Sequence, residues 1–278
     1  MNQKLLLQLA ALFLVTQLLG LYVGNHLLAT VPPEERPHLV TENPEDVENS
    51  VGLFAYILGF TAVLLVVVKF GPEWLVYWIF KGFESLAVFF TSLIVFSVFW
   101  DNVAVVALAF GMVAARNIWP KKVWLRNFSS VLATAGAGSV MGISLGVVPV
   151  AVFIVLLSVY DFIAVFKTKH MVTLAKAITK KNLSFTYALP TKEHTFELGT
   201  GDMVVPLVFS VALLNAFKVG HAYPLYLVPS VAVLVASLAG LLYTVHSASK
   251  KVGGALPALP LQGALMLLVW VGFVLAGY

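Results

Sequence analysis

The chain contains nine long apolar runs separated by short polar segments, and these runs restrict its fold more than any other feature. A helix needs about 20 mostly apolar residues to cross the hydrocarbon core of a bilayer, and each run is close to that length. The runs show no two-residue alternation, which excludes transmembrane barrel strands. They predict about nine transmembrane helices, at residues 5–28, 51–70, 83–100, 103–119, 128–147, 149–166, 198–217, 223–245 and 254–277.

The composition agrees with this all-α, polytopic membrane fold. Hydrophobic residues make up 60% of the chain and charged residues 11%, whereas soluble domains contain roughly 45–50% and about 25%. Nine spans with short loops use nearly all of the 278 residues, so we expect one transmembrane domain, 1–278. Within it we expect N-terminal helices in 1–166, a mobile polar cytoplasmic loop at 168–197 and C-terminal helices in 198–278.

The positions of lysine and arginine predict the orientation, since short cytoplasmic loops collect these residues. With a cytoplasmic N-terminus, 15 of the 17 lysines and arginines lie on the cytoplasmic side, and only Arg36 and Lys218 lie outside. The C-terminus at Tyr278 is then extracytoplasmic. These loop lysines also explain the net charge of +4. No basic surface interleaved with aromatic residues indicates nucleic-acid binding.

Several kinds of catalytic site are excluded by residues that the chain lacks. It has no cysteine, and therefore no thiol nucleophile and no cysteine-bound metal. None of its six histidines lies in a His-Glu-x-x-His pair, so a zinc protease is not supported. Gly142-Ile143-Ser144, with His246 as a base, does not fit an intramembrane serine protease, because a second glycine is missing and the order of the spans differs. We expect neither a metal nor an organic cofactor.

Two acidic residues, Asp161 and Asp202, interrupt the apolar runs. A carboxyl at mid-span costs roughly 2.5–3.5 kcal/mol on insertion scales, so each is a functional candidate. Asp161 lies six residues before Lys167, or roughly 9 Å below the cytoplasmic surface, and Asp202 lies roughly 7.5 Å deep at the start of the next span. Two consecutive antiparallel helices can therefore bring these carboxyls face to face at one level.

A facing carboxyl pair in a low-dielectric site cannot readily lose both protons, because the two negative charges repel each other. Such a pair titrates as a unit, with one member protonated at neutral pH. The ionised member can act as a general base toward water, and the protonated member as an acid toward a peptide carbonyl. The pattern predicts aspartic-protease chemistry and leaves open which aspartate has which role.

The residues around Asp202 make its position more specific. It ends Gly199-Thr200-Gly201-Asp202, in which two glycines allow close backbone approach and non-helical angles. Pro206 follows four residues later, and its missing N–H leaves the Asp202 carbonyl without its helical partner. We therefore expect this end of the span to be irregular, and to accept water or an extended substrate.

Two further motifs belong to this region. Tyr160 precedes Asp161, and Pro257-Ala258-Leu259 opens the last span, where its backbone can approach the carboxyl pair and hold a substrate strand by main-chain hydrogen bonds. Each motif also has a structural interpretation: Tyr160 as a packing aromatic, the glycines as a flexible span entrance, and Pro257 as an ordinary helix start. The β-prone stretch 183–187 is interpreted as a linker rather than a strand.

In this order, Tyr160-Asp161, Gly199-Thr200-Gly201-Asp202 and Pro257-Ala258-Leu259 resemble the presenilin and signal peptide peptidase family of intramembrane aspartyl proteases (GxGD type). The resemblance covers essentially the whole chain. It implies that Asp161 and Asp202 are the catalytic dyad, that Pro257-Ala258-Leu259 shapes the site, and that substrates are transmembrane helices unwound for cutting. The presenilin-like orientation and the missing long loop resemble the compact microbial homologues.

Two other functions use the same residues differently. A proton- or cation-conducting channel or transporter also needs buried carboxylates. A structural scaffold would tolerate their loss, since removing a buried carboxyl usually stabilises a protein. The expected partners are transmembrane substrate proteins and the lipid bilayer. The sequence leaves a homo-oligomer open and contains nothing that requires accessory subunits.

Overall fold

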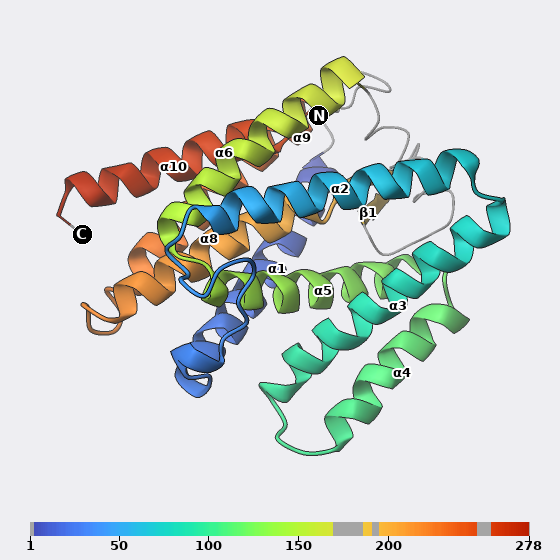
Figure 1. The fold of residues 1–278 in the computed structure, drawn as a ribbon, viewed down its shortest axis with the longest axis horizontal. Helices are drawn as coiled ribbons and strands as arrows, with labels where there is room; N and C mark the ends of the chain where they lie inside the picture. The colour runs from blue at the N-terminus through green and yellow to red at the C-terminus, as the bar shows by residue number, and fades with distance from the viewer. Residues whose placement is uncertain (1–2, 169–185, 191–194, 249–256, 278) are drawn as a thin grey trace.

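The computed structural model describes residues 3–168, 186–190, 195–248 and 257–277, and shows a bundle of α-helices with one small β-hairpin (Figure 1). The all-α prediction is confirmed. The described residues form nine α-helices: α1 (Gln3–Thr30), α2 (Glu48–Phe70), α3 (Glu73–Ser97), α4 (Ala104–Ile118), α5 (Val123–Ser144), α6 (Val147–Ile163), α8 (Gly201–Lys218), α9 (Leu227–Ala248) and α10 (Leu259–Leu275). A short 3-10 helix, η1 (Pro33–Glu35), follows α1, and a π-helical turn, η2 (Ala164–Thr168), ends α6.

The helices have the lengths and apolar character of membrane spans. Six of them, α1, α2, α3, α6, α8 and α9, are long and apolar enough to cross a bilayer, and α4 and α10 are shorter apolar helices. The chain is therefore an integral membrane protein, and the number of nine spans stays a prediction. Figure 1 shows the N-terminus at the end of the bundle that carries the hairpin, and the C-terminus at the opposite end.

Helix α8 lies at the centre of the bundle, where it packs against α1, α5, α6, α9 and α10. It is apolar on all sides, as expected of a helix that is surrounded by other helices. Its contact with α5 is close because Gly142 has no side chain. A Cβ there would lie 2.9 Å from the Val208 carbonyl oxygen. Small residues recur at four-residue spacing along this part of the chain, at Thr134, Gly138, Gly142 and Gly146, a pattern typical of helix packing, and Gly138 and Gly142 fit closely against α8.

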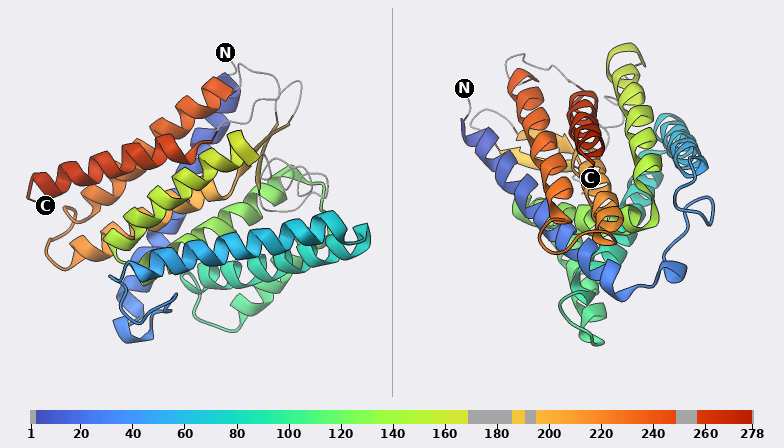
Figure 2. Two further views of the ribbon diagram at one scale, coloured as in Figure 1. Left: turned by 45° about the horizontal axis from the view of Figure 1, so that its top comes forward. Right: turned by 90° about the vertical axis from the view of Figure 1, so that its left-hand side faces the viewer.

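Helix α2 lies at the edge of the bundle beside α6, as both views of Figure 2 show. Only Asn49 and Ser50, in its first turn, are buried. Ser50 Oγ donates a hydrogen bond to the Pro149 carbonyl at the start of α6, at 2.5 Å. The rest of α2 presents apolar side chains outward, which suits contact with lipid.

The loop predicted at 168–197 contains regular structure in the part that can be described. Strands β1 (Thr186–Pro190) and β2 (Thr195–Gly199) pair in antiparallel register, with Ala188 opposite Glu197. Residues 169–185 and 191–194 of this loop lie outside the described residues. The linker interpretation of the 183–187 stretch is wrong at its end, because Tyr187 is fully buried and belongs to β1.

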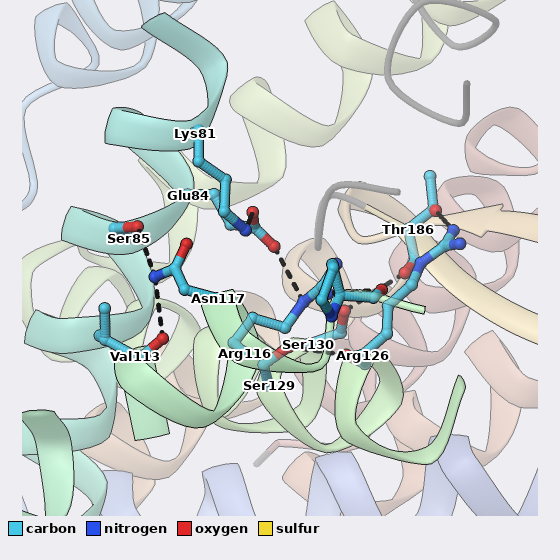
Figure 3. Close-up of polar contacts among 11 residues, drawn as sticks. Lys81, Glu84, Ser85, Val113, Arg116, Asn117, Arg126, Ser129, Ser130 and Thr186 are labelled. Carbon is cyan, nitrogen blue, oxygen red and sulfur yellow. Dashed lines mark hydrogen bonds and ion pairs between the residues drawn. The ribbon is translucent and has the colours of Figure 1, made fainter. Parts of the chain in front are cut away.

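The third helix begins at Glu73, ten residues before the predicted start. Lys81 lies outside the predicted span 83–100 and Glu84 at its start, but both lie inside α3 and are buried. Lys81 Nζ lies 2.6 Å from Glu84 Oε2, and Arg116 Nε of α4 lies 3.0 Å from Glu84 Oε1 (Figure 3). Because these charges compensate one another, they do not interrupt the helix.

Candidate functional site

The two aspartates lie at the facing ends of α6 and α8. Asp161 is two residues from the end of α6, and Asp202 is the second residue of α8. Both side chains are partly buried, and they are close enough for their charges to interact. Among the described residues, no ion pair includes either aspartate. The two carboxyls thus lie near enough to influence each other, and no described ion pair includes either of them.

Pro257-Ala258-Leu259 lies against this pair. Helix α10 begins at Leu259, so Pro257 and Ala258 precede the helix instead of forming its first turn. The backbone N–H of Leu259 donates a hydrogen bond to the Asp161 carboxyl, and Ser158 Oγ, one turn before Asp161, lies 3.4 Å from the Leu259 carbonyl oxygen. The expected approach of this backbone to the aspartates is present in the structure.

The glycines before Asp202 leave space in front of its carboxyl. A Cβ at Gly199 would lie 3.8 Å from Asp202 Oδ2, and a Cβ at Gly201 would meet no atom within 4 Å. Neither glycine has a positive φ, and Thr200 between them is α-helical. Gly199 has extended, non-helical angles as the last residue of β2, whereas Gly201 begins α8. A side chain at Gly199 would instead occupy space beside the carboxyl.

Helix α8 contains Pro206 one turn after Asp202, and the Asp202 carbonyl accepts a side-chain donor in place of the missing backbone N–H. That donor is Gln262 Nε2 of α10, at 3.3 Å. The carbonyl was expected to be open to water or substrate, but a protein amide occupies it. Gln262 was not among the predicted site residues, because a single glutamine in an apolar span gives no sign of its partner.

Tyr160 points toward α2 rather than toward the two carboxyls. Its ring packs edge-on against Phe54, with ring centroids 6.0 Å apart, and its hydroxyl hydrogen-bonds with Thr61. A residue adjacent to Asp161 on a helix points about 100° away from it, which explains this placement. The structure therefore does not bring Tyr160 into contact with both aspartates, and instead joins it to the outer helix.

The β-hairpin leads directly into the Asp202 motif and is anchored on α5. Arg126 of α5 forms an ion pair with Glu197 of β2 and donates a hydrogen bond to Thr186 of β1. Figure 3 shows Arg126 reaching Thr186 from the same region that holds Arg116 and Glu84. One guanidinium thus fixes both strands, and it does so five residues before Asp202. No local sequence pattern pairs Arg126 with Glu197, since 71 residues separate them.

The outer edge of β1 is covered by Asn127 of α5. The Ala188 N–H donates to Asn127 Oδ1, and Asn127 Nδ2 donates to the Ala188 carbonyl, both at 2.8 Å. An amide side chain therefore occupies the position that a third strand would take on this side. In the part of the chain that the structure describes, the hairpin edge without a strand or amide partner is that of β2.

The described residues contain no group of three His, Asp or Glu side chains arranged as metal ligands would be. The groups described at the site are the two carboxyls, the Leu259 N–H and the space beside Gly199 and Gly201. A pair of acids with a shared proton and access to water is suited to hydrolysis.

Comparisons with known proteins agree with this arrangement. The family model described as signal-peptide peptidase, presenilin aspartyl protease matches residues 10–277. One solved presenilin family intramembrane aspartate protease, in a C222 crystal form, is 24% identical with a TM-score of 0.70, and the match covers 97% of this chain and 99% of that chain. A second structure of a presenilin family intramembrane aspartate protease, in a P2 crystal form, is 28% identical with a TM-score of 0.59, and the match covers 94% of this chain and 96% of that chain. No curated protein matches the chain.

Proposed function

Because the chain belongs to the signal-peptide peptidase and presenilin family of aspartyl proteases, we propose that Asp161 and Asp202 are the dyad with which it hydrolyses peptide bonds inside the bilayer. Membership of this family makes the chain an aspartic endopeptidase. The observation that carries the proposal is the interaction of the two carboxyls with each other, without a described cation between them.

In the proposed reaction the ionised carboxyl removes a proton from water as the water oxygen attacks the peptide carbonyl carbon. The protonated carboxyl gives its proton to the carbonyl oxygen, which produces a tetrahedral diol. The carboxyl that took the proton from water gives it to the amide nitrogen, the other carboxyl takes a proton from a diol hydroxyl as the C–N bond breaks, and an amine and a carboxylic acid leave. The Leu259 N–H holds the Asp161 carboxyl in one orientation during these steps.

The proposed substrates are transmembrane helices that are unwound at the site of cutting. Among the described residues β2 pairs only with β1, and this supports the idea, because an extended segment can add to a strand edge by main-chain hydrogen bonds. Strand β2 ends at Gly199, so a segment paired with it would pass the space beside Asp202. The Pro257 segment borders the same space through Leu259.

We also propose that the substrate approaches along α2. A shallow depression of about 640 Å³ is lined by Ala55, Tyr56, Ile57, Gly59, Phe60 and Thr61. Thr61 is the hydrogen-bond partner of Tyr160, which is adjacent to Asp161. Since most of α2 is not buried by other helices, an apolar helix can lie in this depression without displacing the core.

The proposed orientation has a cytoplasmic N-terminus and an extracytoplasmic C-terminus. It rests on the lysine and arginine distribution, and the placement of the two termini at opposite ends of the bundle is compatible with it. Since the chain lacks cysteine, single cysteines introduced at Lys4 and Ala276 can be labelled from either side of a sealed vesicle. The proposal requires the two labels to react from opposite sides.

The decisive experiment is incubation of the purified protein with a generic transmembrane peptide in detergent. We expect cleavage that is lost in Asp161→Ala and that is blocked by a transition-state mimic of aspartic proteases. The rate should have a bell-shaped dependence on pH, because both protonation states of the pair are needed. Cleavage that persists in Asp161→Ala, or a flat profile from about pH 4 to 9, would contradict the dyad.

The alternative of a proton- or cation-conducting channel receives no support from the family to which the chain belongs. It can be tested on the same protein. A channel would conduct ions in liposomes and leave the peptide intact, whereas the proposed protease cleaves it.

A further inference from the structure

Two glutamine side chains bind consecutive carbonyls at the proline of α8. Gln262 Nε2 of α10 lies 3.3 Å from the Asp202 carbonyl, and Gln17 Nε2 of α1 lies 2.8 Å from the Met203 carbonyl. Both glutamines are almost completely buried. The Asp202 carbonyl would normally pair with the N–H four residues later, which Pro206 lacks. The side-chain amide of Gln262 therefore does what the backbone cannot do at this point.

The orientation of Gln262 is determined by its other contacts. Its Nε2 also lies 3.1 Å from Ser237 Oγ of α9, so both hydrogens of the amide have acceptors. A flipped amide would place its oxygen against the Asp202 carbonyl oxygen, which would be repulsive. The backbone is held equally closely, since a Cβ at Gly240 of α9 would lie 3.1 Å from Gln262 Cα. Gln262 thus has one orientation and little room to move.

Leu259 and Gln262 lie three residues apart, in the first turn of α10, so they occupy neighbouring positions on one face. Leu259 binds the Asp161 carboxyl through its N–H, and Gln262 binds the Asp202 backbone through its side chain. A single helical turn is therefore bonded to both aspartates. Any rotation of α8 at Pro206 would have to break the bond to Gln262.

We propose that Gln262 is a positioning residue for the dyad: it replaces the backbone hydrogen bond removed by Pro206 and so holds Asp202 facing Asp161. This inference rests on the proposed function. According to this proposal, Gln262 is needed to position Asp202 only because residue 206 is a proline. A residue with a backbone N–H at position 206 would satisfy the Asp202 carbonyl within α8 and make the glutamine dispensable.

The test is a double-mutant cycle of Gln262→Met and Pro206→Ala, with kcat and KM measured for a transmembrane peptide. On the natural Pro206 background, Gln262→Met should lower kcat by about 10–100-fold and leave KM within about threefold, because misplacement of a catalytic group by about 1 Å can cost about 100-fold. On the Pro206→Ala background the same change should lower kcat by less than about threefold. Equal losses on both backgrounds would overturn the proposal, since they would indicate a purely structural role.

The outcome stays informative if Pro206→Ala alone abolishes cleavage. The same four proteins are then compared by their affinity for a transition-state mimic of aspartic proteases, which also requires the aspartates to face each other. Loss of affinity from Gln262→Met on the Pro206 background only supports the proposal, and equal loss on both backgrounds contradicts it.

Two controls separate this inference from its premise. Gln8→Met removes another glutamine of α1 that has no described contact with Asp202, and should leave kcat unchanged. Asp161→Asn should be inactive. If the wild type and Asp161→Asn behave alike, the proposed function fails. If only the wild type cleaves and Gln262→Met cleaves equally well, the positioning role alone fails.

Discussion

Carboxyl groups are withdrawn from water in two regions of this molecule, and they are compensated in different ways. Glu84 in α3 lies between Lys81 and Arg116, so its charge is balanced by two cations. Asp161 and Asp202 interact with each other and with backbone groups, and no described cation pairs with them. A balanced acid stabilises a helix contact and keeps its charge, whereas two facing acids retain a proton that can be exchanged. The partners of a buried acid, and not its depth below the protein surface, therefore distinguish Glu84 from the two aspartates of the proposed dyad.

The largest expected effect is the loss of activity in Asp202→Asn. Removal of a general acid or base costs about 100- to 10,000-fold in rate, and we expect the upper end of this range because water attack and carbonyl protonation depend on the same pair. The thermal midpoint of unfolding in detergent should not fall, since no cation is left unpaired. If Asp202→Asn keeps its activity, or if its thermal midpoint of unfolding is much lower than that of the wild type, Asp202 has a structural role instead.

Glu84→Gln should show the opposite behaviour. It leaves Lys81 and Arg116 buried without their acid, and breaking a buried ion pair in this way costs about 3–5 kcal/mol of unfolding free energy. Peptide cleavage by the fraction that remains folded should be little changed. Glu35→Gln, at an exposed position of η1, is the matched control, and its unfolding free energy should stay within about 0.5 kcal/mol of the wild type. If Glu84→Gln loses cleavage without a loss of unfolding free energy, the structural role assigned to Glu84 is wrong.

Arg126 and Glu197 lie between these two cases, because their ion pair is partly exposed and anchors the hairpin next to Asp202. Arg126→Met and Glu197→Gln should each lower the unfolding free energy by about 1.5–3 kcal/mol, as expected for a hydrogen bond to a charged group. The double variant should cost less than the sum of the two. Hydrogen exchange at β1 and β2 should increase in each variant, and strictly additive losses would show that the pair is not coupled.

Tyr187→Phe should have the smallest effect, about 1 kcal/mol, through loss of its hydrogen bonds to Thr134 and the Ser130 carbonyl. Burial raises the pKa of Tyr187 to about 12, whereas an unfolded tyrosine ionises near about 10. The native protein should therefore lose about 1.4 kcal/mol per pH unit as the pH rises from about 10 to 12, because only the unfolded state has released its proton. Tyr187→Phe should lack this loss, which alkaline unfolding curves would measure.

Much of the fold and of the candidate site follows from local patterns. The apolar runs predict the helices because each span must satisfy its backbone within itself. The spacing of Asp161 and Asp202 from the ends of their runs predicts that they meet, because consecutive helices are antiparallel and each residue adds a fixed rise. A sequence motif predicted that the backbone of Pro257-Ala258-Leu259 approaches the aspartates. The contact in the structure is a hydrogen bond from the Leu259 N–H to the Asp161 carboxyl.

The remaining features depend on pairs that are distant in sequence. Glu84 was predicted at the end of a span, rather than within one, because its partner Arg116 lies on another helix. The hairpin looked like a linker because its anchor, Arg126, precedes it by 60 residues. Gln262 gave no signal because its role depends on a proline in a different helix. In each case a polar residue, judged from its neighbours in the sequence alone, is expected to be exposed to solvent. In the folded chain it instead contacts a polar partner from a distant part of the sequence.

The closeness of α5 and α8 has a consequence for how tightly the reactive geometry is specified. A Cβ at Gly142 would lie 2.5 Å from Val211 Cβ and 2.9 Å from the Val208 carbonyl oxygen, and both of these atoms are positioned by the α8 backbone rather than by a rotamer. Even one methyl group at position 142 would push α8 away from α5. The position of Asp202 relative to Asp161 therefore depends on the distance between the α5 and α8 backbones. That distance is determined about two turns along α8 from Asp202, at residues that take no part in the proposed reaction.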